Sequence, residues 1–313
     1  MPISALTKIY VAKQTTFGTA ATTGFTLLPV NSCKPRSEYG NILDKGIRGI
    51  AAADFNSQAG VGKGVVEAEG DFYPDILGLL LYQMLGTLTS AGTASPYTHS
   101  FSLLNSAPPI ITLQEVDQVQ TQNFPSMNMK DLTLSFNRAE GALTWKASWE
   151  GEPGATATSE TGADATGAPM IGWQAAVTLG TSAYAKLMSC ELTLAREVSL
   201  VYGANSSQSP NAGYARELSV TAKATVEYTA FADLQKYLNK TQQAFVVNFN
   251  NSGTGTADRQ LTFTATTMDY ADSPYEIDRG EGFLTLAYNL RGIYNTTDVG
   301  PCKIALINAT ATY

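Results

Sequence analysis

The chain has 313 residues, of which 44% are hydrophobic and only 15% are charged, and its net charge is −7. A chain of this length can bury a proper core, in one large all-β domain or in two domains of roughly 150 residues. The acidic balance argues against a protein that grips nucleic acid, because gripping requires Lys and Arg to neutralise phosphates. The longest apolar run, Ile76–Leu85, is far shorter than the roughly 20 residues of a membrane span, so we expect no membrane partner.

Apolar and polar residues alternate with a period of two along most of the chain, which predicts β-strands. In Val66–Phe72 the apolar side chains lie on one face, and Glu67, Glu69 and Asp71 lie on the other. Asn137–Gly141 has the composition of a hairpin turn between two further strands. The other predicted strands cover residues 132–136, 142–150, 187–197, 218–228, 244–250, 260–268, 283–293 and 303–310. Their spacing is typical of sandwiches and barrels.

Two helices are predicted, and each follows an alternating strand. The first, Tyr73–Leu85, has Pro74 in its first turn and Gly86 at its end. The second is Phe231–Leu238. An apolar face on the first helix indicates that it packs against a sheet.

The two strand–helix junctions indicate an internal repeat. Asp75 and Asp233, near the start of the two helices, are 158 positions apart, about half the chain length. Residues 151–169 contain no large apolar residue, which indicates a linker or an exposed loop. We therefore predict a mainly β fold with two related β-sandwich or partial-barrel domains, each with one flanking α-helix. The domains would cover residues 1–150 and 170–313, joined by the linker 151–169.

Residues 31–64 show no sustained hydrophobic periodicity and contain several Lys, Arg and Gly residues. We expect them to form a long loop in the first domain. A structureless loop of this length in a compact domain is usually functional or held by a neighbour. Its charged residues would suit contacts between subunits.

Few residues could carry catalysis. His99 is the only histidine, and it lies in a polar segment, where a structural or solvated side chain is the simpler interpretation. Gly60–Gly64 resembles a phosphate-binding loop, but a glycine follows its lysine where the motif requires Ser or Thr. We therefore expect no enzyme active site and no cofactor.

Acidic residues gather in two places. Glu67, Glu69 and Asp71 could be glycosidase acids or calcium ligands, but a solvated or lumen-facing strand explains them more simply. Asp269–Asp278 holds four acids without the spacing of an EF-hand, which is typical of a loop. No metal site is expected at either place.

The cysteines, Cys33, Cys190 and Cys302, are odd in number and widely spaced, which indicates reduced thiols rather than a disulfide framework or a zinc site. Residues 1–8 lack the apolar stretch of a signal peptide. Both features are expected of a cytosolic product.

Four segments follow one another in a recognisable order. Ile9–Ala20 places an aromatic residue and Gly-Thr before a loop, the long segment 31–64 follows, and Asp75–Leu80 comes after a glycine-containing strand. Gly280–Leu286 precedes the final strand. In this order the chain resembles the tail tube (major tail) proteins of long-tailed bacteriophages.

The resemblance implies a fold and a function. In this family a β-sandwich or partial barrel is flanked by one helix, and subunits close into rings whose inner strands line a lumen. Two tube domains per chain would give a ring of three copies with pseudo-sixfold symmetry, whereas one tube domain with an appended β domain would give a ring of six. The rings would stack in the virion tail after assembly in the host cytoplasm. The partners would be further copies of the chain, the tape-measure and terminator proteins, and DNA in transit without specific binding.

The resemblance also implies roles for particular residues. The segment 31–64 would lie at the contact between rings, and the polar strand faces would face the lumen. The expected contact residues are Arg36, Asp44, Lys45 and Arg48, and the expected lumen residues are Glu67, Glu69, Asp71, Thr221, Thr225 and Glu227. An acidic lumen would let DNA slide without binding, and Lys223 departs from that pattern.

Three other classes remain open from the sequence. A tube-forming protein of a contractile system would share the fold but is usually shorter. An adhesive or carbohydrate-binding β-sandwich would be expected to have a signal peptide and exposed aromatic residues. A glycosidase would use the cluster of acids around Glu69.

Overall fold

The computed structural model describes residues 6–46, 48–49, 53–139, 141–162, 164, 167–228, 231–251, 258–272 and 284–313. Strands make up 58% of the structure and helices 6%, so the predicted mainly β fold is confirmed. Within the described residues the strands form one sheet that does not close into a barrel. No helix in this part of the chain is long and apolar enough to cross a membrane.

The predicted strands and helices occur in the predicted order, and the structure contains several further strands. The first elements are β1 Lys8–Gln14, β2 Thr26–Leu27, β3 Ser32–Asp44, β4 Asn56–Asp71, α1 Gly78–Leu85, β5 Gly86–Ala91, β6 Tyr97–Leu103, β7 Ile110–Val116, β8 Thr121–Asn137, β9 Thr144–Gly151 and β10 Ala155–Thr156. After a short 3₁₀ turn follow β11 Ala175–Leu179, β12 Ser182–Ala183, β13 Leu187–Val201, β14 Ala212–Glu227, α2 Phe231–Leu238, β15 Gln243–Asn251, β16 Arg259–Asp272, β17 Thr285–Gly292 and β18 Lys303–Asn308.

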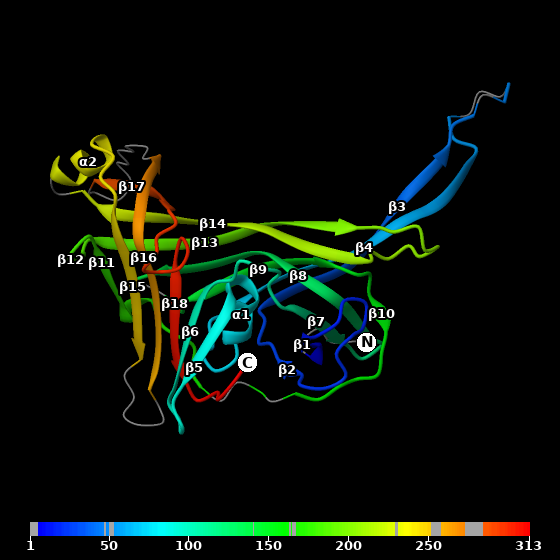
Figure 1. Cartoon of the computed structure of the whole chain (residues 1–313), viewed down its shortest axis with the longest axis horizontal. Coiled ribbons are helices and arrows are strands. Elements are labelled where there is room, and N and C mark those ends of the chain that lie inside the picture. The colour runs from blue at the N-terminus through cyan, green and yellow to red at the C-terminus, as the bar shows by residue number, and fades with distance from the viewer. Residues whose placement is uncertain are drawn as a thin grey trace.

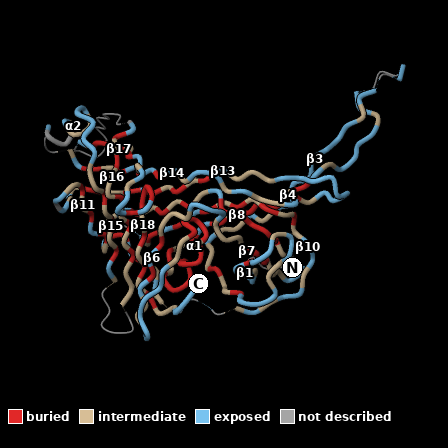
Figure 2. The backbone as a smooth tube through the Cα atoms, viewed as in Figure 1, coloured by how far each residue is buried: buried red, intermediate tan, exposed pale blue. Residues whose placement is uncertain are grey.

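The molecule consists of a body and one projecting arm (Figure 1). The arm is the distal half of the β3–β4 hairpin, which comprises Glu38–Asp44 and Asn56–Val61. Buried residues concentrate in the body around α1 and beneath the long strands, whereas the arm is almost wholly exposed (Figure 2). The arm therefore has no core of its own to hold it.

The loop expected at residues 31–64 is instead most of this hairpin. A strand shows alternation only where one face is buried and the other is wet. Both faces of the arm are exposed, so its residues are not sorted by face and periodicity could not detect the strands. The predicted linker 151–169 also contains a strand, since β10 pairs with β8.

The long strands form a continuous antiparallel sheet in the order β3-β4-β9-β8-β13-β14-β17-β16. The two halves of the chain meet in this sheet where β8 pairs with β13, from Asp131 opposite Ala195 to Asn137 opposite Ser189. We call this pairing the internal seam. The seam makes one sheet from strands that lie in different halves of the sequence.

Both halves repeat the same pairings with the same irregularities. A register shift follows Tyr39 in the β3–β4 ladder, and an equivalent shift follows Arg196, 157 positions later, in the β13–β14 ladder. The residues opposite them, Gly62 and Leu218, are 156 positions apart. Matching shifts also occur between β8–β9 and β16–β17, and between β7–β8 and β15–β16. Shared bulges at equivalent positions are the mark of a duplicated unit, because bulges are built into a fold rather than incidental.

The first unit comprises β1–β4, α1 and β7–β10, and the second comprises β11–β18 and α2. The β5–β6 hairpin, which lies between α1 and β7, has no counterpart among the described residues of the second unit, and its strand β6 pairs with β18 of that unit. The repeated pairings support the predicted division at residues 151–169, which stays a prediction.

One face of the continuous sheet is buried and apolar. Leu132, Leu134 and Phe136 of β8 lie on it, opposite Leu194, Leu192 and Cys190 of β13. Trp145 and Trp149 of β9 are buried beside them, and Trp149 donates a hydrogen bond to Gln83 of α1 over 2.9 Å. The helix packs on this face, as its apolar residues predicted.

A nearly buried ion pair joins the two units. Arg259 of β16 contacts Asp75 before α1 through two atom pairs, Nε–Oδ1 at 2.7 Å and Nη2–Oδ2 at 3.1 Å. The backbone N–H of Ala309 donates a hydrogen bond to the same carboxylate over 3.0 Å. The pair thus connects the first unit to β16 and to the segment after β18.

Leu134→Ala should lower the free energy of unfolding by about 2–5 kcal/mol, because it leaves a cavity in the core. The neighbouring Thr133→Ala is the matched control on the other face and should cost about 1 kcal/mol or less, since it removes one hydroxyl contact. Urea unfolding measures both. Equal losses would contradict the assignment of the two faces.

Asp75→Asn should destabilise the protein by about 3–5 kcal/mol, because it removes a carboxylate charge that contacts the largely buried guanidinium of Arg259. Glu38→Gln removes an exposed partner of Arg36 and should cost less than about 1 kcal/mol. Thermal and denaturant unfolding compare the two variants. A small effect at Asp75 would show that the pair does not join the units.

Candidate assembly surfaces

The face of the sheet opposite the core is polar. A row of cross-strand neighbours runs from Glu69 through Lys146, Thr133 and Thr193 to Thr221. Residues directly opposed in a sheet point to the same side, so these five side chains share one face. Alternation along β4 and β14 adds the other residues predicted to face a lumen, which are Glu67, Asp71, Thr225 and Glu227. All six predicted lumen residues thus lie on one continuous surface, which we call the polar face.

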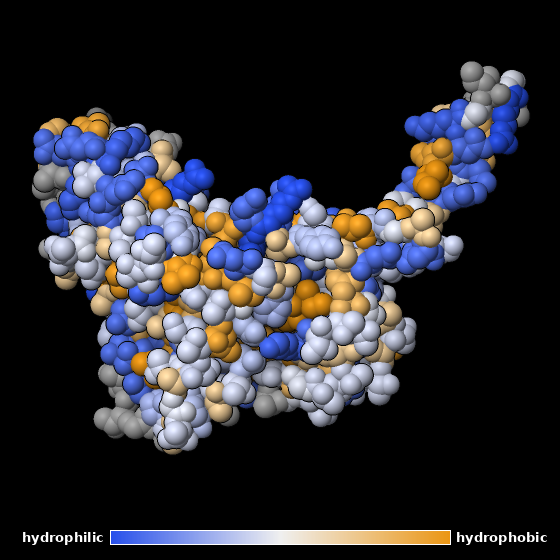
Figure 3. Space-filling view, viewed as in Figure 1, coloured by the Kyte–Doolittle hydropathy of each residue, from blue (hydrophilic) through white to orange (hydrophobic). Residues whose placement is uncertain are grey.

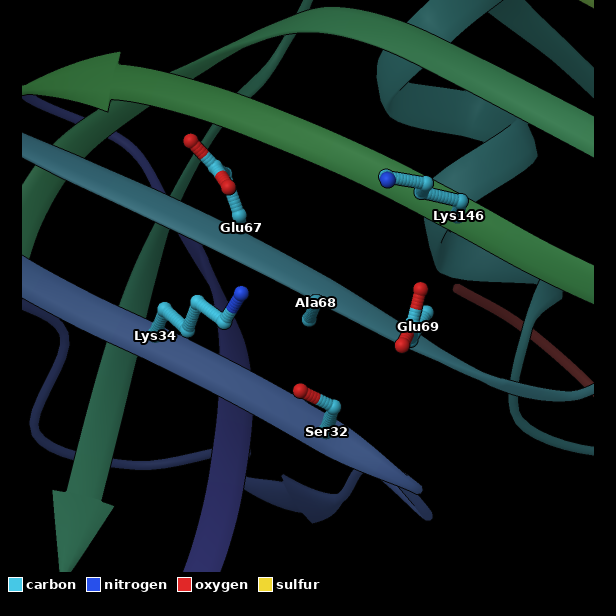
Figure 4. Close-up of a pocket in the computed structure, with 6 residues that line it drawn as sticks. All are labelled: Ser32, Lys34, Glu67, Ala68, Glu69 and Lys146. Atoms are coloured by element: carbon cyan, nitrogen blue, oxygen red, sulfur yellow. The ribbon is translucent and has the colours of Figure 1, made fainter.

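Charges of both signs are interleaved on the polar face. Figure 4 shows Glu67 and Glu69 of β4 flanked by Lys34 of β3 and Lys146 of β9. The register places Lys34 opposite Glu67 and Lys146 opposite Glu69. Lys223 of β14 likewise lies opposite a glutamate of β13. The polar face is therefore a surface of mixed charge and not a uniformly acidic wall.

Strand β3 ends the continuous sheet, and no strand among the described residues pairs with its outer edge. Gly62, opposite Tyr39, donates its N–H away from β3, to the carbonyl of Gln208 over 2.8 Å. Antiparallel alternation therefore directs the N–H groups of Tyr39 and Ser37 outward. Pro35 occupies another outward position, where its missing N–H costs the β3–β4 ladder nothing.

Apolar side chains accompany this open edge on the arm. Tyr39 is 51% exposed and Ile42 61%, and Leu43 and Val61 are exposed as well. Figure 3 shows this apolar surface on the arm among hydrophilic residues. A long exposed edge strand with apolar side chains is a template for pairing with another chain. The arm and the β3 edge together are a surface for association.

The residues predicted to contact other subunits do not form one cluster. Arg36 lies near the base of the arm and contacts Glu38 and Glu67 of its own chain at 2.7 and 3.1 Å. Asp44 and Arg48 pair with each other at the tip. Lys45 is exposed beside them. Their contact with a second subunit stays a prediction.

Arg196 is a residue that the sequence reading did not single out. It lies on β13 in phase with the buried Leu192 and Leu194, and it is only 5% exposed. Its Nε donates to the carbonyl of Met84 over 3.0 Å and its Nη1 to that of Arg216 over 3.2 Å, whereas its Nη2 has no hydrogen-bond partner among the described residues. Burial lowers the pKa of this guanidinium. A charged residue at a core position of an alternating strand was the available signal.

The histidine has a structural environment. His99 is fully buried, with its Nδ1 2.8 Å from the hydroxyl of Ser90 and its Nε2 2.8 Å from the carbonyl of Thr310. Within the described residues, no group of three or more His, Cys, Asp or Glu side chains could hold a metal ion. Residues 273–283, which include most of the acidic segment Asp269–Asp278, lie outside the described residues.

A duplicated β unit, a continuous polar face and an open strand edge are typical of a structural β protein that can associate through its strands. The family model for phage tail tube proteins matches residues 4–291. The chain belongs to the phage tail tube protein family, as its order of elements predicted. No curated protein matched the sequence. The chain is therefore a structural subunit of a tail tube, it assembles with further copies and other tail components, and it is located in the virion tail.

The three thiols should react slowly in the folded protein. Burial raises the pKa of Cys33 to about 12 and also raises the pKa values of Cys190 and Cys302. The thiolate is the reactive form, so at pH 8 a thiol reagent should label the native chain far more slowly than the urea-unfolded chain. Rapid labelling of one thiol in the native chain would contradict its burial.

Proposed function

We propose that three copies of the chain close into a ring with pseudo-sixfold symmetry and that the rings stack into a tube. The observation that carries this proposal is the internal seam, where β8 of the first unit pairs edge to edge with β13 of the second. The register shifts make β13 the equivalent of β3. The unpaired edge of β3 is thus the same edge that is already paired at the seam.

Repeating the seam between chains gives a closed ring. Strand β16, which ends the continuous sheet opposite β3, corresponds to β8, and it would pair with β3 of the next copy. Asp272 of β16 corresponds to Asp131, the first seam residue of β8. It is also the last residue of β16 that the structure describes. A head-to-tail contact that closes by rotation makes a ring and removes free strand edges. Two units per chain favour three copies over the six that a single tube domain would need.

The polar face is the natural wall of the lumen. The apolar face of the sheet is covered by α1 and other elements of the body, so only the polar face is free to line an interior. Acids there lie opposite lysines, and threonine hydroxyls meet at the seam. Such a wall offers DNA neither a cationic track to bind nor a strongly repelling field. The tube would conduct DNA in a long-tailed phage, with the tape-measure protein inside during assembly and the terminator protein at its end.

Negative-stain electron microscopy of the purified chain at increasing concentration tests the ring. We expect hollow tubes or stacked rings with threefold symmetry. Averaged images of rings that contain six chains would contradict the proposed ring of three chains. A chain that stays monomeric at all concentrations and binds glycans would favour the adhesive β-sandwich instead.

Ser37→Pro should weaken assembly about fivefold per contact, because it removes one outward N–H of β3, and a hydrogen bond is worth roughly 1 kcal/mol. Ser37→Ala is the matched control. Both variants lose the hydroxyl that accepts the N–H of Gly154 over 2.9 Å, but only the proline loses the outward donor. Light scattering measures assembly and circular dichroism verifies the fold. Equal assembly of the two variants would argue against pairing at this edge.

A further inference from the structure

The two units carry equivalent hairpins that rest in different places. The β3–β4 ladder ends at Asp44 opposite Asn56, and the β13–β14 ladder ends at the equivalent pair, Val201 opposite Ala212. The distal half of β13–β14 lies along the body with its turn beside β4, whereas the arm extends into solvent (Figure 1). One hairpin is therefore seated within the chain, and its counterpart is not.

The seat of the β13–β14 turn is the edge of β4 beyond the end of β9. The carbonyl of Gln208 accepts the N–H of Gly62 over 2.8 Å, and its Nε2 donates to the carbonyl of Ala59 over 3.3 Å. The hydroxyl of Tyr202 donates to the carbonyl of Gly62 over 3.2 Å. The turn thus satisfies backbone groups of β4 that no strand reaches.

The second unit has the same seat, and it is open. The register shifts make Leu218 the equivalent of Gly62 and Ala215 the equivalent of Ala59. Both residues line a groove of about 670 Å³ beyond the end of β17, with Leu103, Tyr294 and other residues on its walls. The backbone N–H and C=O of Gly62 point away from β3 and toward the turn. Because Leu218 occupies the equivalent position on β14, its backbone N–H and C=O point into this groove.

A buried cation marks the groove as incomplete. Arg196 lines it, and this guanidinium has no carboxylate partner among the described residues and one nitrogen without an acceptor. That nitrogen has almost no accessible surface, so a group in the groove would not contact it directly. A carbonyl or carboxylate seated in the groove would still lower the electrostatic cost of the buried charge.

We propose that the groove between Ala215, Leu218 and Arg196 receives the arm of the next copy in the ring. This inference rests on the proposed ring, in which the junction between two copies repeats the junction within one chain. There the first unit of the next copy lies beside the second unit of this one. The arm would then take the place that the β13–β14 turn takes on β4. Its exposed apolar side chains, Tyr39 and Ile42, would be covered, and its backbone carbonyls or acidic groups would lie near the charge of Arg196.

The equivalence also assigns a partner to Lys45. It is 157 positions before Tyr202, the same interval that separates Tyr39 from Arg196, so it occupies the place of Tyr202 at the end of its hairpin. Tyr202 donates to the carbonyl of Gly62, and Lys45 would donate to the carbonyl of Leu218 in the neighbouring copy. The exposed Glu217 lies next to that carbonyl and would favour the ammonium group.

Cross-linking tests this contact in the assembled tube. Lys45→Cys combined with Glu217→Cys should yield covalently linked chains with a short bis-maleimide. Lys45→Cys combined with Ala94→Cys, at the exposed turn of β5–β6, is the matched control and should not. The native thiols are a slow background, because their raised pKa values keep them protonated, and Cys190 and Cys302 are also buried. Tubes that form without the specific cross-link would overturn the seating of the arm and leave the ring proposal standing.

Filling the groove is the second test. Ala215→Trp should reduce tube formation at least tenfold while leaving the unfolding transition of the monomer close to that of the unchanged protein, and Ala94→Trp should assemble normally. Normal assembly of Ala215→Trp would overturn the inference. Failure of the unchanged chain to assemble would instead contradict the proposed ring, so the two failures are distinguishable.

Discussion

Unpaired backbone groups at strand edges are the constraint on which this structure depends. Each edge strand presents a row of N–H and C=O groups that must be paired, covered or protected. The chain meets this requirement once internally, at the seam between β8 and β13. It leaves the equivalent edge on β3 open, with only Pro35 interrupting its donors. Among the described residues, the molecule therefore pairs one of two equivalent strand edges within the chain and leaves the other available to another chain.

The elements with one buried face could be predicted from the sequence, and those with two exposed faces could not. Leu132–Phe136 alternates because its apolar side chains enter the core, and the structure has a strand there. The arm has no buried face, so its residues do not alternate and the same reasoning predicted a loop. The repeat was visible at Asp75 and Asp233, but its true interval emerges from the register shifts near Tyr39 and Arg196. Register depends on cross-strand pairing, which no single segment contains.

The charge of the polar face could likewise be predicted only in part from the sequence. The acids of β4 stand at alternate positions in one short segment, so their common face could be predicted. Lys34 and Lys146, which lie opposite Glu67 and Glu69, come from strands far away in the sequence. The polar face looked acidic along one strand, but across three strands it carries charges of both signs. The sequence likewise shows that Arg196 occupies a core position of a strand, but it does not show which groups contact its guanidinium. Those contacts come from segments that are distant in the sequence.

The β5–β6 hairpin gives the two kinds of junction in such a ring unequal strength. Within a chain, the seam is reinforced by the pairing of β6 with β18 and by the contact of Arg259 with Asp75, besides the covalent connection through residues 151–169. Among its described residues, the second unit has no counterpart of this hairpin that could brace the proposed junction with the next chain. A tube under tension or bending would therefore yield between chains and not within them. Each proposed ring would have three weaker junctions between chains and three stronger seams within chains, although its inner wall would consist of six similar units.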